Sequence, residues 1–146
     1  MIRMIDVGGK EPTAREAVAE GVIVMTPQTA EAIRAARVPK GDVLAAARVA
    51  AIMAAKRTAD ILPLCHPLPL DVVEVGFELG ADRVCVMVTT RATARTGVEM
   101  EALTGAAAAL LTIYDMCKGL DRAMTIGQLR LLRKTGGKTG DYIRSE

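Results

Sequence analysis

One short segment restricts the fold of this chain more than any other. Residues 62–70 read Leu-Pro-Leu-Cys-His-Pro-Leu-Pro-Leu, and we call them the proline strap. Proline holds φ at about −65° and pushes the residue before it toward extended backbone. The strap is therefore stiff and non-helical. It contains His66, the only histidine of the chain, so it is either an apolar connector with a satisfied histidine or a rigid support for a side chain that titrates near neutral pH.

The patterns on either side of the strap predict both helices and strands. Thr26-Pro27 and Asp42 are typical helix N-caps, and Gly80-Ala81-Asp82 is typical of a hairpin turn. Irregular backbone is expected at both ends of the pattern, in residues 1–14 and 135–141. The predicted elements are a strand at 16–25, helices at 27–36 and 43–59, strands at 70–79 and 83–94, and a helix at 98–118. The short apolar segment 126–134 is either a strand or a helix, and its pattern favours the strand.

This order favours an α+β fold, an antiparallel sheet with helices packed on one face. The chain has 146 residues, which suits a single domain over 1–146. Apolar residues make up 51% of the chain but aromatic residues only 2%, so the core must consist of small aliphatic side chains. Alanine-rich helices of this kind approach each other closely and often pack against a neighbouring chain. We therefore expect an oligomer.

Charge and cysteine content exclude several classes of protein. A net charge of +2 is too small to indicate nucleic-acid binding. No signal peptide or membrane span is predicted. Cys65, Cys85 and Cys117 are far apart and odd in number, which indicates reduced thiols in the cytoplasm rather than disulfides or a metal site.

The predicted helix 98–118 contains the first candidate for chemistry. Six of its residues share one face and leave room for a ligand or another helix: Glu101, Gly105, Ala108, Thr112, Asp115 and Lys118. The close pair Asp115 and Lys118 is either a solvated ion pair worth a few tenths of a kcal/mol or an acid/base pair. In the second case the neighbours Tyr114, Met116 and Cys117 would partly remove it from water.

The start of the same helix contains a second acidic cluster, Glu99 and Glu101. Carboxylates are common there because the helix dipole favours them. Glu101 and Asp115 are about 21 Å apart along a helix, so one chain cannot bring them into one small site. A two-fold pair of antiparallel helices would, and a shared site would then lie between subunits.

Basic residues also gather at the breaks between elements, namely Lys40, Lys56, Arg57, Arg91, Arg95, Lys134 and Lys138. Cations at helix C-termini are ordinary, whereas cations in glycine-rich loops favour phosphate. The triplet Gly137-Lys138-Thr139 is not a P-loop, because Leu132 stands where that motif needs its first glycine.

Six segments in order resemble one known family, that of molybdenum cofactor biosynthesis protein C. They are Lys40–Leu44, Ala54–Thr58, Leu62–Leu68, Arg95–Thr104, Thr112–Lys118 and Lys134–Asp141. The resemblance runs from about Met4 to Asp141. It implies a ferredoxin-like α+β fold, a cytoplasmic homohexamer built as a trimer of dimers, and active sites between subunits.

The implied activity is that of a cyclic pyranopterin monophosphate synthase. The resemblance implies that cyclised dihydro-GTP is the substrate, that its purine is rearranged to a pyranopterin, and that pyrophosphate is expelled as a cyclic phosphate closes. No resident cofactor or metal is implied, and whether magnesium accompanies the triphosphate is left open.

The resemblance also implies roles for individual residues. Lys118 would be the general acid/base, Asp115 would set its charge state, and Lys40 would protonate a ring nitrogen or the leaving group. Substrate binding is implied for eight residues: Leu64, Cys65, His66, Glu99, Met100, Glu101, Lys56 and Lys134. Of these, Lys56 and Lys134 would hold the triphosphate.

Two rival functions remain from the residues alone. A protein that sequesters a pterin or nucleotide phosphate would also use the loop cations, but it would leave the acid/base pair without a role. A purely structural oligomer would leave the stiff strap unexplained. Substrate turnover separates both rivals from an enzyme.

Overall fold

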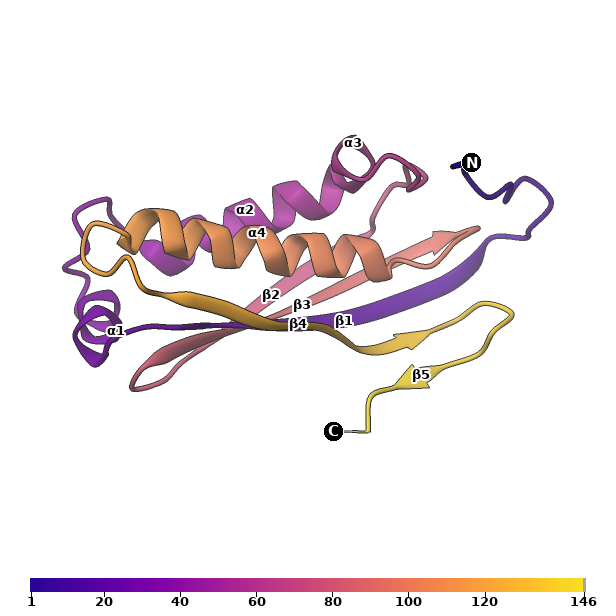
Figure 1. Ribbon diagram of the computed structural model, residues 1–146. Coiled ribbons are helices and arrows are strands. Elements are labelled where there is room, and N and C mark those ends of the chain that lie inside the picture. The colour runs from indigo at the N-terminus through magenta and orange to yellow at the C-terminus, as the bar shows by residue number, and fades with distance from the viewer. Residues whose placement is uncertain (146) are drawn as a thin grey trace.

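The computed structural model describes residues 1–145 and contains a five-stranded sheet, all antiparallel, with helices on one face (Figure 1). The strand order is β2-β3-β1-β4-β5. This is the predicted ferredoxin-like α+β arrangement. The elements are β1 Thr13–Val24, α1 Pro27–Arg34, α2 Val43–Lys56, α3 Thr58–Ile61, β2 Val72–Leu79, β3 Arg83–Ala94, α4 Glu99–Cys117, β4 Thr125–Thr135 and β5 Tyr142–Ile143.

The helix starts agree with the caps that the sequence predicts. The Thr26 hydroxyl accepts a hydrogen bond from the Thr29 amide at 3.2 Å, and the Asp42 carboxylate accepts one from the Ala45 amide at 3.1 Å. Each bond gives a side-chain acceptor to an amide in the first turn of a helix, where the carbonyl four residues earlier is missing. The cap residues therefore set where α1 and α2 begin.

The helix ends differ from the prediction. Helix α1 ends at Arg34, and Ala36 takes a left-handed φ of 56° instead of continuing it. Helix α2 ends at Lys56, three residues early. The Thr58 hydroxyl donates to the carbonyls of Ala54 and Ala55 at 3.1 and 2.9 Å. Those bonds satisfy carbonyls at the end of α2, and the chain turns there into the short α3.

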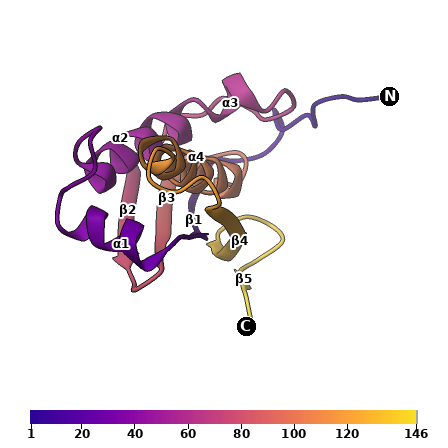
Figure 2. The ribbon, with the colours of Figure 1, turned by 60° about the vertical axis from the view of Figure 1, so that its left-hand side comes forward.

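The core depends on small side chains, as the composition predicts. Helix α4 lies beside α2 and over β1 and β3 (Figures 1 and 2). Gly105 of α4 faces α2 so closely that a Cβ there would lie 3.1 Å from the Ala51 carbonyl oxygen. At Gly105, the face of α4 that also carries Glu101 and Asp115 therefore packs against another helix.

The loops gather at two opposite ends of the molecule. The N-terminal arm (residues 1–12), the proline strap, the start of α4 and the turn between β4 and β5 lie at one end (Figure 1). The loop from α1 to α2 lies at the other end, together with the end of α4. Every residue with a predicted catalytic or binding role lies toward one of these ends.

Candidate functional site

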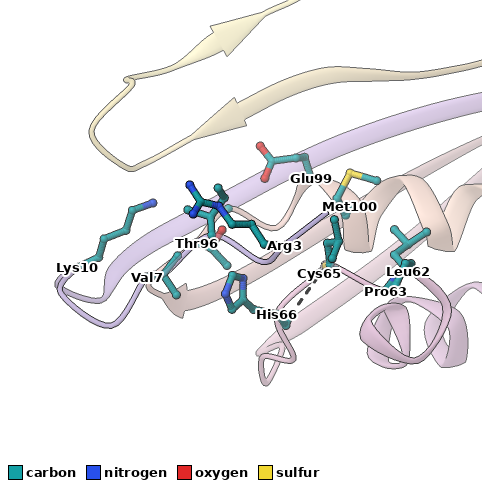
Figure 3. Close-up of a pocket in the computed structure, with 13 residues that line it drawn as sticks. Arg3, Val7, Lys10, Leu62, Pro63, Cys65, His66, Thr96, Glu99 and Met100 are labelled. Atoms are coloured by element: carbon teal, nitrogen blue, oxygen red, sulfur yellow. Dashed lines mark hydrogen bonds between the residues drawn. The ribbon is translucent and has the colours of Figure 1, made fainter. Parts of the chain in front are cut away.

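A cavity of about 590 Å³ opens where the N-terminal arm, the proline strap and the start of α4 meet (Figure 3). We call it the strap cavity. Five of the predicted binding residues line it: Leu64, Cys65, His66, Glu99 and Met100. The fold thus brings together two segments that are far apart in the sequence, in a space of the size that small-molecule ligands occupy.

Two hydrogen bonds hold the walls of this cavity. The Cys65 amide donates to the Leu62 carbonyl at 3.2 Å and closes a turn as the chain leaves α3. The buried Thr90 hydroxyl donates to the Val98 carbonyl at 2.9 Å and ties the start of α4 to β3. These two bonds fix the backbone from which the strap and the start of α4 present their side chains to the cavity.

Glu101 lies beneath the strap and is only 3% exposed. The Cys65 thiol donates to its Oε2 at 3.7 Å, while its Oε1 has no hydrogen-bond partner among the residues that the structure describes. Burial raises the pKa of the Glu101 carboxyl. A buried acceptor without a partner is unusual, and Glu101 lines a small cavity of about 90 Å³ together with His66 and Lys56.

The Cys65 thiol is a weak donor and not a nucleophile in this setting. Burial, followed by the charge of nearby Glu101, raises its pKa to about 11. The thiolate that attacks electrophiles is then scarce at neutral pH. Cys65 therefore contributes shape and a hydrogen bond to the strap cavity.

Replacing Glu101 by glutamine is expected to stabilise the fold at pH 7.5 by about 1 kcal/mol, because a buried acceptor without a partner is costly as a carboxylate. A carboxyl whose pKa is raised by folding stabilises the fold below its unfolded pKa, and this contribution is lost as pH rises through the folded pKa. At pH 4 the gain from Glu101→Gln should therefore vanish. Thermal unfolding at both pH values measures it, as a rise of roughly 2–4 °C at pH 7.5.

The matched control is Glu78→Gln, which neutralises an exposed carboxylate on β2. It should leave the unfolding temperature nearly unchanged at both pH values. An unfolding temperature for Glu101→Gln that equals or falls below the wild-type value at pH 7.5 would contradict the assigned cost of the buried charge.

A second cluster lies at the other end of α4. The Lys40 ammonium donates to the Asp115 carboxylate at 3.3 Å and to the Asp115 carbonyl at 3.1 Å. Lys118 lies 3.5 Å from the other carboxylate oxygen. The hydrogen bond from Lys40 is the main reason that the pKa of Asp115 is lowered. One carboxylate therefore holds two lysines, and we call the three residues the lysine cluster.

The loop before α2 places Lys40 in this cluster. Gly41 has a φ of 115°, which favours glycine, and its amide donates to the Val38 carbonyl at 3.0 Å. Val38 itself is buried and anchors the turn. The sequence spacing predicted the pairing of Asp115 with Lys118, but it did not predict that Lys40 would complete the cluster.

Of the two alternatives for Asp115 and Lys118, the solvated ion pair describes the single chain, and the partial removal from water is not seen there. Their side chains are 59% and 53% exposed. Cys117 points into the core instead, and the Tyr114 hydroxyl donates to the Arg122 carbonyl at 2.9 Å. The neighbours therefore do not cover the pair, because α4 turns them toward the sheet and the following loop.

The two clusters are separate within one chain. Glu101 stands in the first turn of α4 and Asp115 in the last, about 21 Å apart along the axis. The structure thus agrees with the distance argument from the sequence. Any site that uses both clusters needs residues from a second copy of the chain.

The remaining predicted cations have different surroundings. Lys134 pairs with Glu99 at 2.8 Å next to the strap cavity. Lys56 lines a separate cavity of about 90 Å³ with His66 and Glu101. Arg91 pairs with carboxylates on both neighbouring strands, so an ion pair accounts for it without a ligand.

Sequence reasoning missed the contribution of the N-terminal arm. Arg3 and Lys10 line the strap cavity, and Lys10 lies on its side nearest the turn between β4 and β5 (Figure 3). The sequence predicts irregular backbone for the arm, so it does not indicate where the arm's side chains lie relative to the rest of the fold. The Gly9-Lys10 pair, which matches the Gly137-Lys138 pair in the tail, is the signal that could have drawn attention to it.

Among residues 1–145, no group of three or more histidine, cysteine, aspartate or glutamate side chains is arranged to hold a metal ion. No helix in the same range has the length and apolar character needed to cross a membrane.

Comparisons with known proteins give a consistent result. A family model described as the MoaC family matches residues 4–137. A protein from Novosphingobium aromaticivorans is 56% identical over 144 residues, which is 99% of this chain and 92% of that protein. A protein from Pelobacter propionicus is 56% identical over 98% of this chain and 91% of its own length. A protein from Roseiflexus sp. is 53% identical over 97% of this chain and 90% of its own length. All three carry the name cyclic pyranopterin monophosphate synthase.

Proposed function

This chain belongs to the MoaC family, and from that premise we propose that it converts (8S)-3',8-cyclo-7,8-dihydroguanosine 5'-triphosphate to cyclic pyranopterin monophosphate and pyrophosphate. It is a lyase of molybdenum cofactor biosynthesis. The observation that best supports the substrate proposal is the strap cavity, where Cys65, His66, Glu99 and Met100 line a space of about 590 Å³. His66 also lines the smaller cavity that reaches Glu101.

In this proposal the strap cavity binds the substrate. Leu64, Cys65 and His66 contact it from the strap, and Met100 and Glu101 contact it from α4. The free Oε1 of Glu101 is suited to accept an N–H group of the base. Glu99 acts as a supporting carboxylate, and Lys56 and Lys134 contact the phosphates.

The lysine cluster supplies the proton transfers. Lys118 acts as general acid/base in opening the aminal carbon–nitrogen bond, and Lys40 protonates a ring nitrogen or the leaving group. Asp115, kept ionised by Lys40, orients both ammonium groups. A lysine can serve in both protonation states, which an arginine cannot.

The complete site lies between two subunits. The separation of Glu101 and Asp115 along α4 supports this proposal, since a two-fold arrangement of antiparallel helices places one chain's strap cavity beside the other chain's lysine cluster. The exposure of the lysine cluster in one chain agrees with a partner that covers it. The oligomer in this proposal is a cytoplasmic homohexamer, a trimer of dimers.

Purified protein incubated with the cyclised dihydro-GTP tests the proposal directly. Stoichiometric release of pyrophosphate together with a pterin product is the expected result. Saturable binding with no loss of substrate would mean that the chain carries the compound without converting it, and the catalytic roles above would then be withdrawn.

A further inference from the structure

The lysine cluster is assembled from two loops at the end of the molecule opposite the strap cavity (Figure 1). Lys118 directly follows α4, and Lys40 lies in the loop between α1 and α2. Lys40 reaches α4 through its own long side chain, which is half exposed where it bonds Asp115. An exposed ion pair holds two side chains only weakly. The spacing of the two ammonium groups therefore depends on how firmly the backbone of both loops is held.

Asp121, in the loop after α4, joins these two regions. The residue is only 8% exposed. Its Oδ2 accepts hydrogen bonds from the Thr26 amide at 2.9 Å and from the Thr29 hydroxyl at 3.4 Å. Its Oδ1 accepts a hydrogen bond from the Ala123 amide at 3.1 Å. One buried carboxylate thus binds the N-terminus of α1 and the backbone of its own loop at the same time.

A carboxylate is well suited to this position. Helix α1 has no acidic residue in its own first turn, although the free amides and the dipole of a helix favour negative charge there. Asp121 supplies that charge from a position 95 residues away from Thr26. Hydrogen bonds from amides to an ionised carboxylate are stronger than those between neutral groups. The contact is therefore a strong link between distant segments.

The link is short on the side of Lys118. Asp121 follows Lys118 by three positions. The amides of Leu120 and Asp121 both donate to the carbonyl of the buried Cys117, at 2.8 and 3.1 Å. The turn that contains Lys118 is closed by these bonds, so a shift of Asp121 would move Lys118 with it.

On the side of Lys40, α1 carries the link onward. The Arg37 amide donates to the Ala32 carbonyl at 2.8 Å as the chain leaves α1. The Gly41 amide then donates to the carbonyl of the buried Val38 at 3.0 Å, around the turn that contains Lys40. Successive backbone bonds therefore connect the position of α1 to the position of Lys40.

We propose that Asp121 is a positioning residue for the reaction, which sets the spacing of Lys40 and Lys118 by holding the loop after α4 against α1. It acts through the two lysines and contacts no reacting atom. The effect on catalysis rests on the proposed function, whereas the link between the loops can be measured without any substrate.

Hydrogen exchange of the wild-type oligomer and of Asp121→Asn, followed by mass spectrometry, tests the link without turnover. Asparagine keeps the size of the side chain but has only one oxygen, so it can accept from Thr26 or from Ala123 but not from both. Exchange in residues 35–41, which include Lys40, should become about tenfold faster. Asp82→Asn is the control. It neutralises an exposed carboxylate in the turn between β2 and β3, and it should exchange as wild type.

The rate of pyrophosphate release from cyclised dihydro-GTP tests the effect on catalysis. Asp121→Asn should lower kcat by about 10- to 100-fold and leave KM within about twofold, because a misplaced acid/base slows the chemical step more than it weakens binding. Thr29→Val removes a hydroxyl donor to the same carboxylate and should give a smaller loss in the same direction. It also keeps the inference testable if Asp121→Asn fails to assemble. Asp82→Asn should keep the wild-type kcat and KM.

A double-mutant cycle separates positioning from a general structural role. In a chain that already has Lys40→Ala, Asp121→Asn should cost much less of the remaining single-turnover rate than it costs in wild type, because the group that it positions is gone. Full and independent losses for the two substitutions would show that Asp121 only supports the fold, and would overturn the inference.

The outcomes also separate this inference from the proposed function. Faster exchange in residues 35–41 with a normal control supports Asp121 as the link, even if the wild type does not consume cyclised dihydro-GTP. Unchanged exchange there, or faster exchange confined to residues 26–29 and 118–124, overturns the link even if the wild type is fully active. A loss expressed in KM alone overturns the role in positioning the lysines.

Discussion

Lys118→Ala is expected to lower the rate of pyrophosphate release by about 10²- to 10⁴-fold, the range by which a positioned acid/base accelerates a reaction. The side chain is 53% exposed, so its removal should cost little folding free energy. Pyrophosphate release under single-turnover conditions measures the loss. Size-exclusion chromatography should show an unchanged oligomer.

Two further variants test whether Lys118 acts by proton transfer or only by its positive charge. Lys118→Arg keeps a positive charge beside Asp115 but cannot give up its proton, so it should be nearly as slow as the alanine variant. Arg122→Ala removes an exposed cation from the same end of the chain and should remain active. Near-normal turnover in Lys118→Ala would remove this residue from the mechanism, and an active Lys118→Arg would reduce its role to charge.

Mixed oligomers of Lys118→Ala and His66→Ala chains are expected to be more active than oligomers of either variant alone. A chain with Lys118→Ala keeps its strap cavity, and a chain with His66→Ala keeps its lysine cluster. In a two-fold dimer of the two chains, one of the two sites is intact. Random pairing makes half of the dimers mixed, so co-expression should restore about a quarter of the wild-type rate.

The control uses two variants of the same cluster, Lys118→Ala with Lys40→Ala. Every site would lack one lysine in any pairing, so this mixture should stay inactive. Failure of the first mixture, with mixed oligomers confirmed by two affinity tags, would contradict a site shared between chains. Recovery in the control mixture would contradict the assignment that each site takes both lysines from the same chain.

The sequence predicted the local structure well where short-range physics controls it. Thr26 and Asp42 cap the helices that they were expected to cap, and Gly80-Ala81-Asp82 joins the two strands of the hairpin. Each of these signals depends on a few neighbouring residues. The break of α2 at Arg57 was missed because it depends on the Thr58 hydroxyl competing for helix carbonyls, a choice that propensity alone does not determine. The pairing of β5 with β4 was missed as well.

The strap and the start of α4 were each recognised from the sequence, but their contact was not. Cys65 and Glu101 meet across 36 positions because α2 and α4 pack side by side on one sheet. The same packing leaves Asp115 and Lys118 exposed, which matches the solvated alternative of the two that the sequence left open. Which face of a helix is covered depends on what packs against it, and sequence spacing only says which residues share a face.

By itself, the sequence determined the order of the longer helices and strands, the alanine-built core and the separation of Glu101 from Asp115 along one helix. These properties follow from caps, turns, side-chain size and the rise of an α-helix, which act over a few residues. Only the tertiary structure decided that Lys40 joins Asp115, that Glu101 is buried with one free oxygen, and that Lys10, Arg15 and Lys138 line one cavity. Those contacts join residues distant in the sequence, and they exist because the packed sheet and helices bring the loops at each end together.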